Sequence, residues 1–351
     1  MTKSNNHKYV DFIKANRSEE QAEMIYSQRI KDAQEVHRKF SSSFEHRSCP
    51  ICGGSKVNKQ EDFIDLYSIV KCRTCNSDYV NPVPGAEALD FYYNNCFSNV
   101  QFEKLSRSRT GASSIILSDR LLEVSRIIQS LLYKKDCVNV VEIGCSSGAF
   151  LNDLHQYLIK HELEKRVILS GVDIDESAIS NSVTEGIELH ASSAQDFAKN
   201  FPNKFDLILN FELIEHLHDP YEFMISMKNI LSNDGLFHFH TPNAKGFDNM
   251  GLGYNDFRPL AHGIFPPMHL QAFTTENIVH FAIRCDFDVV RIDTPGNFDV
   301  DIVKRFISRS EDNKSNFHYI SSFDENQLAI IQSWLRDLNC SSHLVVTLSQ
   351  H

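Results

Sequence analysis

Short apolar runs alternate with helical segments over the last two thirds of the chain, from about residue 113 onward. The apolar runs occupy residues 138–143, 167–172, 205–209, 236–239, 287–292 and 344–348, with a weaker one at 187–189. The helical segments occupy residues 115–133, 149–160, 176–185, 220–231, 275–284 and 324–338. This alternation is typical of a mainly parallel sheet with helices on both faces. We therefore predict an α/β domain over residues 113–351.

Two Cys-x-x-Cys pairs lie ahead of this domain, Cys49-Pro50-Ile51-Cys52 and Cys72-Arg73-Thr74-Cys75. A gap of two residues lets both thiolates of a pair face one ion, and the 19 residues between the pairs suit a β-hairpin. Four thiolates favour tetrahedral Zn²⁺ and leave no position for water, so we predict a structural zinc ribbon over residues 48–82. A thioredoxin-like redox pair is disfavoured because neither pair has a βαβ setting.

Charge and composition limit the partners of the chain. The formal net charge is −11, and because residues 1–47 hold nine basic and seven acidic groups, the remainder carries −13. The ribbon segment 48–82 holds four groups of each sign. A chain with this excess of negative charge repels phosphate backbones, so we expect no nucleic-acid partner. No apolar run reaches the roughly 20 residues of a membrane helix, so we expect no membrane partner.

The nine cysteines and the start of the chain bear on the compartment. The first eight residues lack an apolar signal core, and an odd cysteine count without an export signal favours a reduced, cytoplasmic compartment. We interpret the cysteines outside the two pairs as ordinary small hydrophobic residues. They are Cys96, Cys137, Cys145, Cys285 and Cys340.

The segments that flank the ribbon are simpler. Residues 1–47 form a helical segment, in which a helix over 9–40 is predicted from apolar residues at spacings of three and four. Those residues are Ala22, Tyr26, Ile30, Ala33, Val36 and Phe40. We interpret this helix as a docking or homodimerising element, with a substrate-covering role as the alternative. Residues 83–112 are predicted to be a polar and aromatic connector that follows the stiff sequence Asn81-Pro82-Val83-Pro84-Gly85.

A turn of small residues follows the first strand of the α/β domain. Glu142-Ile143 continues into Gly144-Cys145-Ser146-Ser147-Gly148. Ligands bind at such turns, beyond the carboxyl ends of parallel strands. A dinucleotide-binding loop needs glycine at 144, 146 and 149, and a P-loop needs Gly-Lys-Ser/Thr, so neither fits. An acidic residue at 142 with small residues at 144, 146 and 148 resembles the first motif of the class I S-adenosylmethionine-dependent methyltransferases, although Ser146 replaces the usual middle glycine.

Later segments extend this resemblance closely over about 135–294 and loosely over 113–351. Asp173 ends the second strand, 25 residues after Gly148. In other Rossmann-like sites an acidic side chain at this position accepts hydrogen bonds from the ribose hydroxyls. The alternative role is a helix N-cap, which suits Asp175 better. Residues 192–196 follow the third strand, where the family reads adenine. The resemblance implies a Rossmann-like sheet whose last strand is antiparallel, and S-adenosylmethionine as cofactor. It implies as cofactor-binding residues Glu142, Gly144, Cys145, Ser146, Gly148, Asp173, Ile174, Ser193, Ala194, Asn210 and Glu212.

The ribbon and this domain together resemble a bacterial methyltransferase subgroup that modifies cell-surface or natural-product sugars. The resemblance implies a small acceptor, such as a nucleotide-linked sugar or a surface-polysaccharide sugar, and a role in carbohydrate biosynthesis. Two alternatives stay open. One is an RNA methyltransferase whose ribbon contacts nucleic acid, and the other is a non-catalytic binding module with the same fold.

Methyl transfer to a hydroxyl or carbon acid needs a proton acceptor, and histidine suits this task near neutral pH. His216 follows the fourth strand, His240 lies near the end of the fifth strand on the same face as His238, and His269 precedes a helix. We predict His216, His269 and His240 as the catalytic candidates, with Glu212 and Glu215 as weaker ones; Glu215 could instead cap the next helix. A long segment, about 242–270, is predicted to bind the acceptor, with an irregular surface loop as the alternative.

Overall fold

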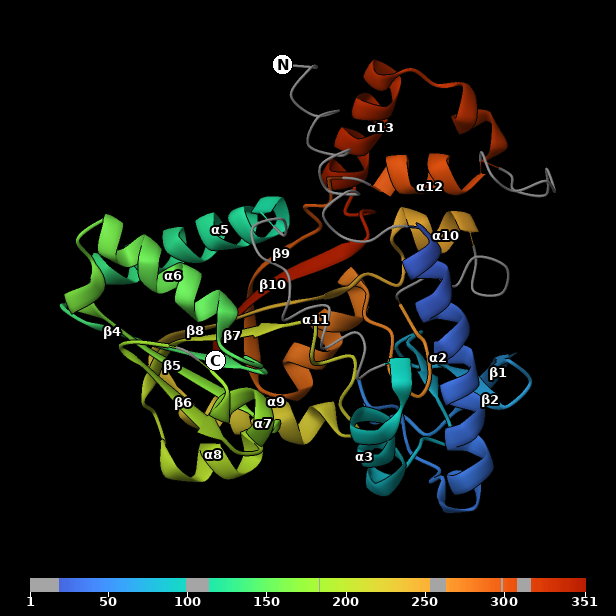
Figure 1. Cartoon of the computed structure of the whole chain (residues 1–351), viewed down its shortest axis with the longest axis horizontal. Helices are drawn as coiled ribbons and strands as arrows, with labels where there is room; N and C mark the ends of the chain where they lie inside the picture. The colour runs from blue at the N-terminus through green and yellow to red at the C-terminus, as the bar shows by residue number, and fades with distance from the viewer. Residues whose placement is uncertain (1–18, 99–113, 183, 253–262, 298, 308–316) are drawn as a thin grey trace.

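A seven-stranded sheet forms the centre of the chain (Figure 1). The computed structural model describes residues 19–98, 114–182, 184–252, 263–297, 299–307 and 317–351. Across the sheet the strands are β6 (Ile187–Ala191), β5 (Val167–Asp173), β4 (Val138–Ile143), β7 (Phe205–Phe211), β8 (Leu231–Pro242), β10 (His343–Gln350) and β9 (Phe287–Asp293). The pairs among β6, β5, β4, β7 and β8 are parallel, and β10 is antiparallel to both of its neighbours. The predicted α/β sheet with an antiparallel last strand is confirmed.

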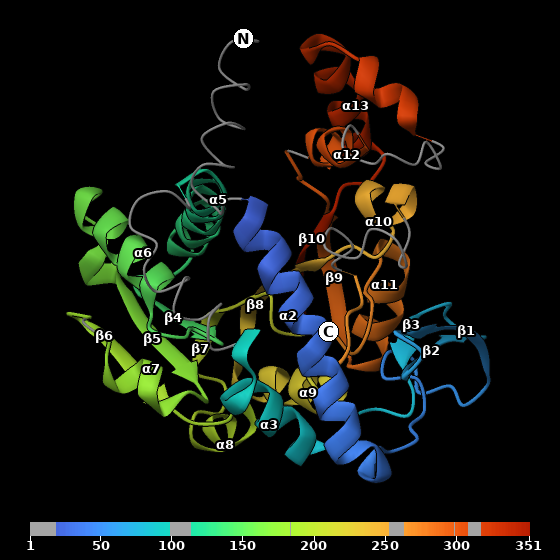
Figure 2. The same ribbon diagram turned by 45° about the vertical axis from the view of Figure 1, so that its right-hand side comes forward.

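Helices cover both faces of this sheet (Figures 1 and 2). On one face lie α5 (Ser114–Leu132) and α6 (Ala149–Lys160), and on the other lie α8 (Ala194–Asn200), α9 (Pro220–Ile230) and α11 (Thr275–Arg284). The sheet is apolar on both sides because residues of β4 such as Val140 and Val141 are both fully buried. This explains why these strands appear in the sequence as continuous apolar runs.

One predicted helix is shorter than expected, and one short helix was not predicted. Helix α7 (Glu176–Ser180) ends five residues before the predicted end at 185. Just beyond it, the Ser182 hydroxyl donates to the Ser147 carbonyl oxygen at 2.7 Å, so this stretch packs onto the turn after β4 instead of continuing the helix. A short 3-10 helix, η2 (Glu164–Arg166), precedes β5.

The ribbon segment forms its own three-stranded antiparallel sheet. Its strands are β1 (Val57–Phe63), β2 (Tyr67–Cys72) and β3 (Asp78–Val80), and β1 and β2 form the hairpin between the two cysteine pairs. The predicted connector over 83–112 is wrong in one respect, because helix α3 (Ala86–Asn95) forms within it. The buried side chains of this helix are Ala88, Leu89 and Tyr92, one apolar face that the polar composition of the segment conceals. Residues 99–112 lie outside the described residues.

The leading helix is α2 (Glu19–Phe40), followed by the 3-10 helix η1 (Ser41–Ser43). The predicted stretch 9–18 lies outside the described residues. Ala33 and Val36 are fully buried within this chain, and the Tyr67 hydroxyl donates to the Ala33 carbonyl oxygen at 2.7 Å. The helix therefore docks on the ribbon and on α3, and the homodimer stays a prediction (Figure 2).

A small helical lobe lies between β9 and β10 in sequence. It consists of α12 (Asp299–Ile307), the 3-10 helix η3 (His318–Ser322) and α13 (Glu325–Asp337), with α10 (Phe247–Leu252) beside α12. Val300, Val303 and Ile320 form its own buried cluster. Only α13 had a counterpart in the sequence analysis, the predicted helix at 324–338. Among the described helices, none combines the length and apolar character needed to cross a membrane.

Candidate functional site

The turn after β4 contains three residues with left-handed backbone conformation. Gly144, Ser146 and Gly148 have φ values of +81°, +47° and +76°. The amides of Gly144 and Cys145 both donate to the Val172 carbonyl oxygen, at 2.8 and 3.1 Å, which ties the turn to the end of β5. A side chain at 144 would be strained by this φ and would place a Cβ 3.0 Å from Leu213.

Asp173 holds the same turn from the end of β5. One carboxylate oxygen accepts from the Ser146 amide at 2.7 Å and the other accepts from the Asp175 amide at 2.8 Å. Each oxygen keeps a further lone pair for a hydroxyl donor. Asp175 caps α7 by accepting from the Ala178 amide at 2.9 Å, so the N-cap role belongs to Asp175, and ribose binding by Asp173 stays a prediction.

Two buried acceptor atoms at this edge of the sheet have no hydrogen-bond donor among the described residues. They are Oε2 of Glu142 and Oδ1 of Asn210. The Asn210 side chain is fixed, because its Nδ2 donates to the Ile143 carbonyl oxygen at 2.9 Å. Burial raises the pKa of Glu142 to about 8, an effect that Arg120 partly offsets. Buried acceptors without donors indicate a ligand that brings donors, and an amino group fits.

The other predicted cofactor residues lie around this edge with different exposures. Ile174 is 80% exposed beyond β5, so its side chain presents an apolar surface at the strand end. Ser193 caps α8, accepting from the Asp196 amide at 3.1 Å, and Ala194 begins that helix. Glu212 has φ +54°, and its amide donates to the His240 carbonyl oxygen at 3.0 Å.

The cysteines outside the two pairs only partly match the expectation. Cys96, Cys145 and Cys285 are buried, as small hydrophobic residues are. Cys137 is exposed and Cys340 is half-buried, so that interpretation is wrong for these two. Both lie at the ends of elements, Cys137 just before β4 and Cys340 just before β10.

Glu215, His216 and His269 meet beyond the end of β7. The rings of His216 and His269 are 4.6 Å apart and perpendicular, and Nε2 of His216 lies 3.6 Å from Oε1 of Glu215. The other oxygen of Glu215 accepts from the Thr241 hydroxyl at 2.9 Å. Glu215 does not cap the next helix, because Asp219 does so by accepting from two backbone amides of α9. The structure thus brings two of the three predicted histidines together.

Tyr93 of α3 completes this group, and sequence analysis missed it. Its hydroxyl lies 3.0 Å from Nδ1 of His216. The signal was the run Phe91-Tyr92-Tyr93, three consecutive aromatic residues in a segment that we interpreted as a connector. Such a run in a connector indicates a buried helix face or a ligand contact.

Burial sets the charge of this group. Together with the charge of Arg29 on α2, it lowers the pKa of His216 to about 4. It raises the pKa of Glu215 well above its usual range, with Glu212 adding to the effect. The imidazole is therefore neutral at pH 7, and burial favours the protonated form of the carboxyl.

His240 lies apart from these residues. Side chains alternate along a strand, so Thr241 reaches Glu215 on one face of β8 while His240 points to the other face. There its ring meets Phe211 edge-on at 5.0 Å, and its Nε2 lies 3.2 Å from Nε2 of His238. The predicted pairing of His238 and His240 on one face is therefore seen, but His240 is not part of the His216–His269 group.

Val80 of the ribbon and Arg47, just ahead of the ribbon, form hydrogen bonds with the segment that carries His269. Arg47 donates to the carbonyl oxygens of His218 and Leu270, at 2.7 and 3.1 Å. The Val80 amide donates to Leu270, and the Leu270 amide donates to the Glu215 carbonyl oxygen, both at 2.9 Å. Residues 263–272 are buried, so the surface-loop alternative is wrong there; residues 253–262 of the predicted acceptor segment lie outside the described residues.

The four ribbon cysteines have the arrangement of a metal site. Their Sγ atoms are 3.6 Å apart in the pair Cys49–Cys75 and 3.5 Å apart in the pair Cys52–Cys72. Zinc–sulfur bonds of about 2.3 Å place tetrahedral sulfurs about 3.8 Å apart, so the donor set fits Zn²⁺. The amides of Gly54 and Thr74 point at sulfurs at 3.4 Å, as they do around thiolates.

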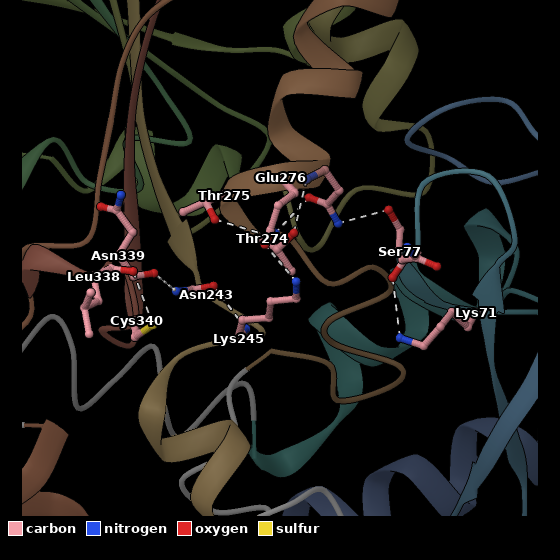
Figure 3. A network of polar contacts seen from close by, with 12 residues as sticks. Lys71, Ser77, Asn243, Lys245, Thr274, Thr275, Glu276, Leu338, Asn339 and Cys340 are labelled. Carbon is pink, nitrogen blue, oxygen red and sulfur yellow. Dashed lines mark hydrogen bonds and ion pairs between the residues drawn. The ribbon is translucent and has the colours of Figure 1, made fainter. Parts of the chain in front are cut away.

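One more contact joins this cysteine cluster to α11. Ser77 lies 3.0 Å from the Cys75 sulfur, and its hydroxyl accepts from Nδ2 of Asn277 at 2.9 Å. Figure 3 shows Ser77 facing the start of α11, where Lys245 and Glu276 form an ion pair at 2.8 Å. The cysteine cluster therefore supports the helix that follows the His269 segment.

Comparisons with known proteins address the α/β domain. A family model described as a methyltransferase domain matches residues 116–292, just over half of the chain. A ubiquinone biosynthesis O-methyltransferase of Neisseria meningitidis serogroup C is 25% identical over 114 residues, which are 30% of this chain and 44% of that protein. The match thus spans less than half the length of this curated relative.

Solved structures of methyltransferases match at low identity. The plantazolicin methyltransferase BamL, in complex with a triazolic desmethylPZN analog and SAH, is 13% identical and has a TM-score of 0.46, covering 75% of this chain and 94% of that chain. A SAM-dependent methyltransferase from Archaeoglobus fulgidus is 19% identical and has a TM-score of 0.40, covering 66% and 94%. The family match rests on the domain that carries the turn after β4, Asp173 and the order of the strands. The chain belongs to the methyltransferase domain family, in the class I S-adenosylmethionine-dependent group.

Proposed function

We propose that this chain transfers a methyl group from S-adenosylmethionine to a small polar acceptor whose reacting atom loses a proton. The observation that carries the proposal is the group formed by Tyr93, Glu215, His216 and His269. It lies beyond the end of β7, the strand whose residue Asn210 carries one of the two acceptor atoms without a donor.

The residues at the ends of β4, β5 and β7 fit the cofactor. Glu142 and Asn210 would accept from its amino group, Asp173 would accept from its ribose hydroxyls, and the backbone from Gly144 to Gly148 would lie against it. When bound, S-adenosylmethionine supplies a methyl group on a sulfonium that is already activated for displacement. What this chain must add is alignment, exclusion of water and removal of a proton.

Proton removal is assigned to Tyr93 and His216. The Tyr93 hydroxyl takes the proton of the acceptor while its own proton moves to Nδ1 of His216, 3.0 Å away. Burial keeps His216 neutral, so one ring nitrogen has a lone pair, and the relay uses the tautomer in which that nitrogen is Nδ1. The imidazolium formed lies 3.6 Å from Oε1 of Glu215, and the edge-on ring of His269 fixes its plane. Glu212 has no place in this relay, because it faces Arg120 and His343.

A nucleotide-linked or surface-polysaccharide sugar fits as acceptor, and carbohydrate biosynthesis as the process. Sugar hydroxyls, and the carbon acid beside a keto group of a sugar, need a base of this kind. The acidic body of the chain and the balanced charge of the ribbon disfavour RNA. Arg47, which a nucleic-acid surface would expose, is instead bound to His218 and Leu270.

The ribbon is proposed to hold one structural zinc ion on Cys49, Cys52, Cys72 and Cys75. Four thiolates stay reduced in the cytoplasm, which is the compartment we propose. The ion would hold the ribbon in the shape that clasps Leu270, so that its effect on catalysis is indirect. A homodimer through the outer face of α2 remains a proposal, and sedimentation at several concentrations would test it.

An acceptor screen tests the proposed function. Purified protein is incubated with S-adenosylmethionine carrying a labelled methyl group and with panels of nucleotide sugars, polysaccharide fragments and RNA. We expect label in a sugar acceptor and none in RNA. Label in RNA alone would establish the RNA methyltransferase, and calorimetry showing no binding of S-adenosylmethionine would establish the non-catalytic module.

A further inference from the structure

A second group of ligand-type side chains lies on the α5 face of the sheet, away from the ribbon cysteines. Glu123 comes from α5, and His238 and His240 come from β8. His238 is fully buried, His240 is 8% exposed, and the Glu123 side chain is 18% exposed. The proposed methyl transfer uses none of the three.

The three ligand atoms have the mutual distances of a tetrahedral metal site. Nε2 of His240 lies 3.2 Å from Nε2 of His238 and 3.4 Å from Oε2 of Glu123. Nε2 of His238 and Oε2 of Glu123 are 3.8 Å apart. Zinc bonds to imidazole and carboxylate of about 2.0–2.2 Å place tetrahedral ligand atoms about 3.3–3.6 Å apart. The triangle of Glu123, His238 and His240 therefore has the size of one face of such a site.

Neighbouring groups orient two of these ligands. Nδ1 of His238 lies 3.0 Å from the hydroxyl of Thr347, the residue paired with His238 on β10. Nε2 of His238 therefore faces His240 and Glu123. Arg291 of β9 approaches Oε1 of Glu123 at 3.4 Å, which leaves Oε2 for the imidazoles. Metal-bound histidines commonly have such a hydrogen bond at the second ring nitrogen.

The positive charges nearby are paired. Arg291 also forms an ion pair with Asp293, and Arg120 lies 3.9 Å from Glu212 with its guanidinium over the Phe211 ring. The carboxylates of Asp293 and Glu212 therefore offset the repulsion that these guanidinium groups would exert on a cation.

We propose that Glu123, His238 and His240 bind one divalent transition-metal ion of the zinc class. Two imidazoles with one carboxylate suit Zn²⁺, Co²⁺ or Ni²⁺, whereas Mg²⁺ and Ca²⁺ prefer oxygen ligands. Three protein ligands leave a fourth position for water. The ion would join α5 to β8 and would be separate from the ribbon ion. The competing account is a hydrogen bond between the two imidazoles with no metal, and the test decides between them.

Metal content of the full chain, purified and dialysed against Zn²⁺ and then against metal-free buffer, tests the proposal. We expect about two equivalents of zinc in the wild type and about one in Glu123→Gln and in His240→Asn. His351→Asn is the matched control, because His351 also contacts a carboxylate, Asp288 at 3.0 Å, but is exposed and belongs to no group of three ligand-type side chains among the described residues. It should keep the wild-type content.

Two readouts separate this ion from the ribbon ion and from a folding defect. With Co²⁺, the thiolate-to-cobalt charge-transfer band reports the ribbon alone, so Glu123→Gln should keep that band and lose part of the ligand-field absorption. Added Zn²⁺ should raise the melting temperature of the wild type and leave that of Glu123→Gln unchanged. The proposal is overturned if the dialysed wild type holds one equivalent, or if Glu123→Gln and His240→Asn both retain the second.

Discussion

The hydroxyl of Tyr93 lies 3.0 Å from Nδ1 of His216, although 123 residues separate the two in sequence. Tyr93 belongs to a helix between the ribbon and the methyltransferase domain, and His216 follows the fourth strand in sequence of that domain. The contact makes the segment ahead of the α/β domain part of the proposed acceptor site. It also means that the chemistry of His216 depends on a residue outside the family match, which begins at residue 116.

His216 should make stability depend on pH. Burial lowers its pKa from 6.5 to about 4, so the unfolded state binds a proton more readily between these values. Stability is therefore fully present above about pH 6.5 and is lost as the pH falls toward 4, by up to about 3 kcal/mol at 1.36 kcal/mol per pKa unit. Urea unfolding at pH 7 and pH 5 measures the loss. We expect a smaller loss in His216→Gln, and an equal loss in the variant would refute the assignment.

Asp173→Ala should weaken the binding of S-adenosylmethionine. The change removes the acceptors for the ribose hydroxyls and the support of the Ser146 amide. We expect at least about tenfold weaker binding, or about 1.4 kcal/mol, by calorimetry. Asp234→Ala, which alters an exposed carboxylate near the start of β8, is the control and should bind as wild type does. Unchanged affinity in Asp173→Ala would place the cofactor elsewhere.

Cys72→Ala should lower both zinc content and thermal stability. The proposed ion would contribute to the folding of the ribbon. The ribbon residue Val80, with Arg47 just ahead of the ribbon, holds Leu270. Elemental analysis should find less than about half of the wild-type ribbon zinc, and the melting temperature should fall. Cys137→Ala removes an exposed thiol far from the pairs in sequence and should change neither quantity. Full zinc in Cys72→Ala would contradict the ligand assignment.

Much of the fold was predictable from local patterns. The strands of the sheet are apolar runs because both faces are covered, and the turn after β4 carries small residues because its φ values are positive. The place of Asp173 at the carboxyl end of β5 was also predictable, because the apolar run of that strand ends there. The four ribbon cysteines were predictable because their spacing alone brings sulfurs together.

The group formed by Tyr93, Glu215, His216 and His269 was only partly predictable, because it depends on contacts between distant segments. His216 and His269 were found by their places next to strands, but nothing local shows that Tyr93 reaches His216 or that Arg47 reaches Leu270. His240 was grouped with them because it lies near the end of β8. Strand alternation turns it to the opposite face, where its neighbours are His238 and Glu123.

The rate of methyl transfer by Tyr93→Phe tests the central proposal most directly. The assay is single-turnover transfer of labelled methyl to the acceptor found by screening, with the affinity for S-adenosylmethionine measured in parallel. Loss of the hydroxyl removes the group that takes the proton, so the rate should fall by about 10²–10⁴-fold while cofactor affinity stays at the wild-type value. Tyr133→Phe, at a tyrosine that is 96% exposed, should transfer at the wild-type rate. A wild-type rate in Tyr93→Phe would contradict the proposed relay between Tyr93 and His216.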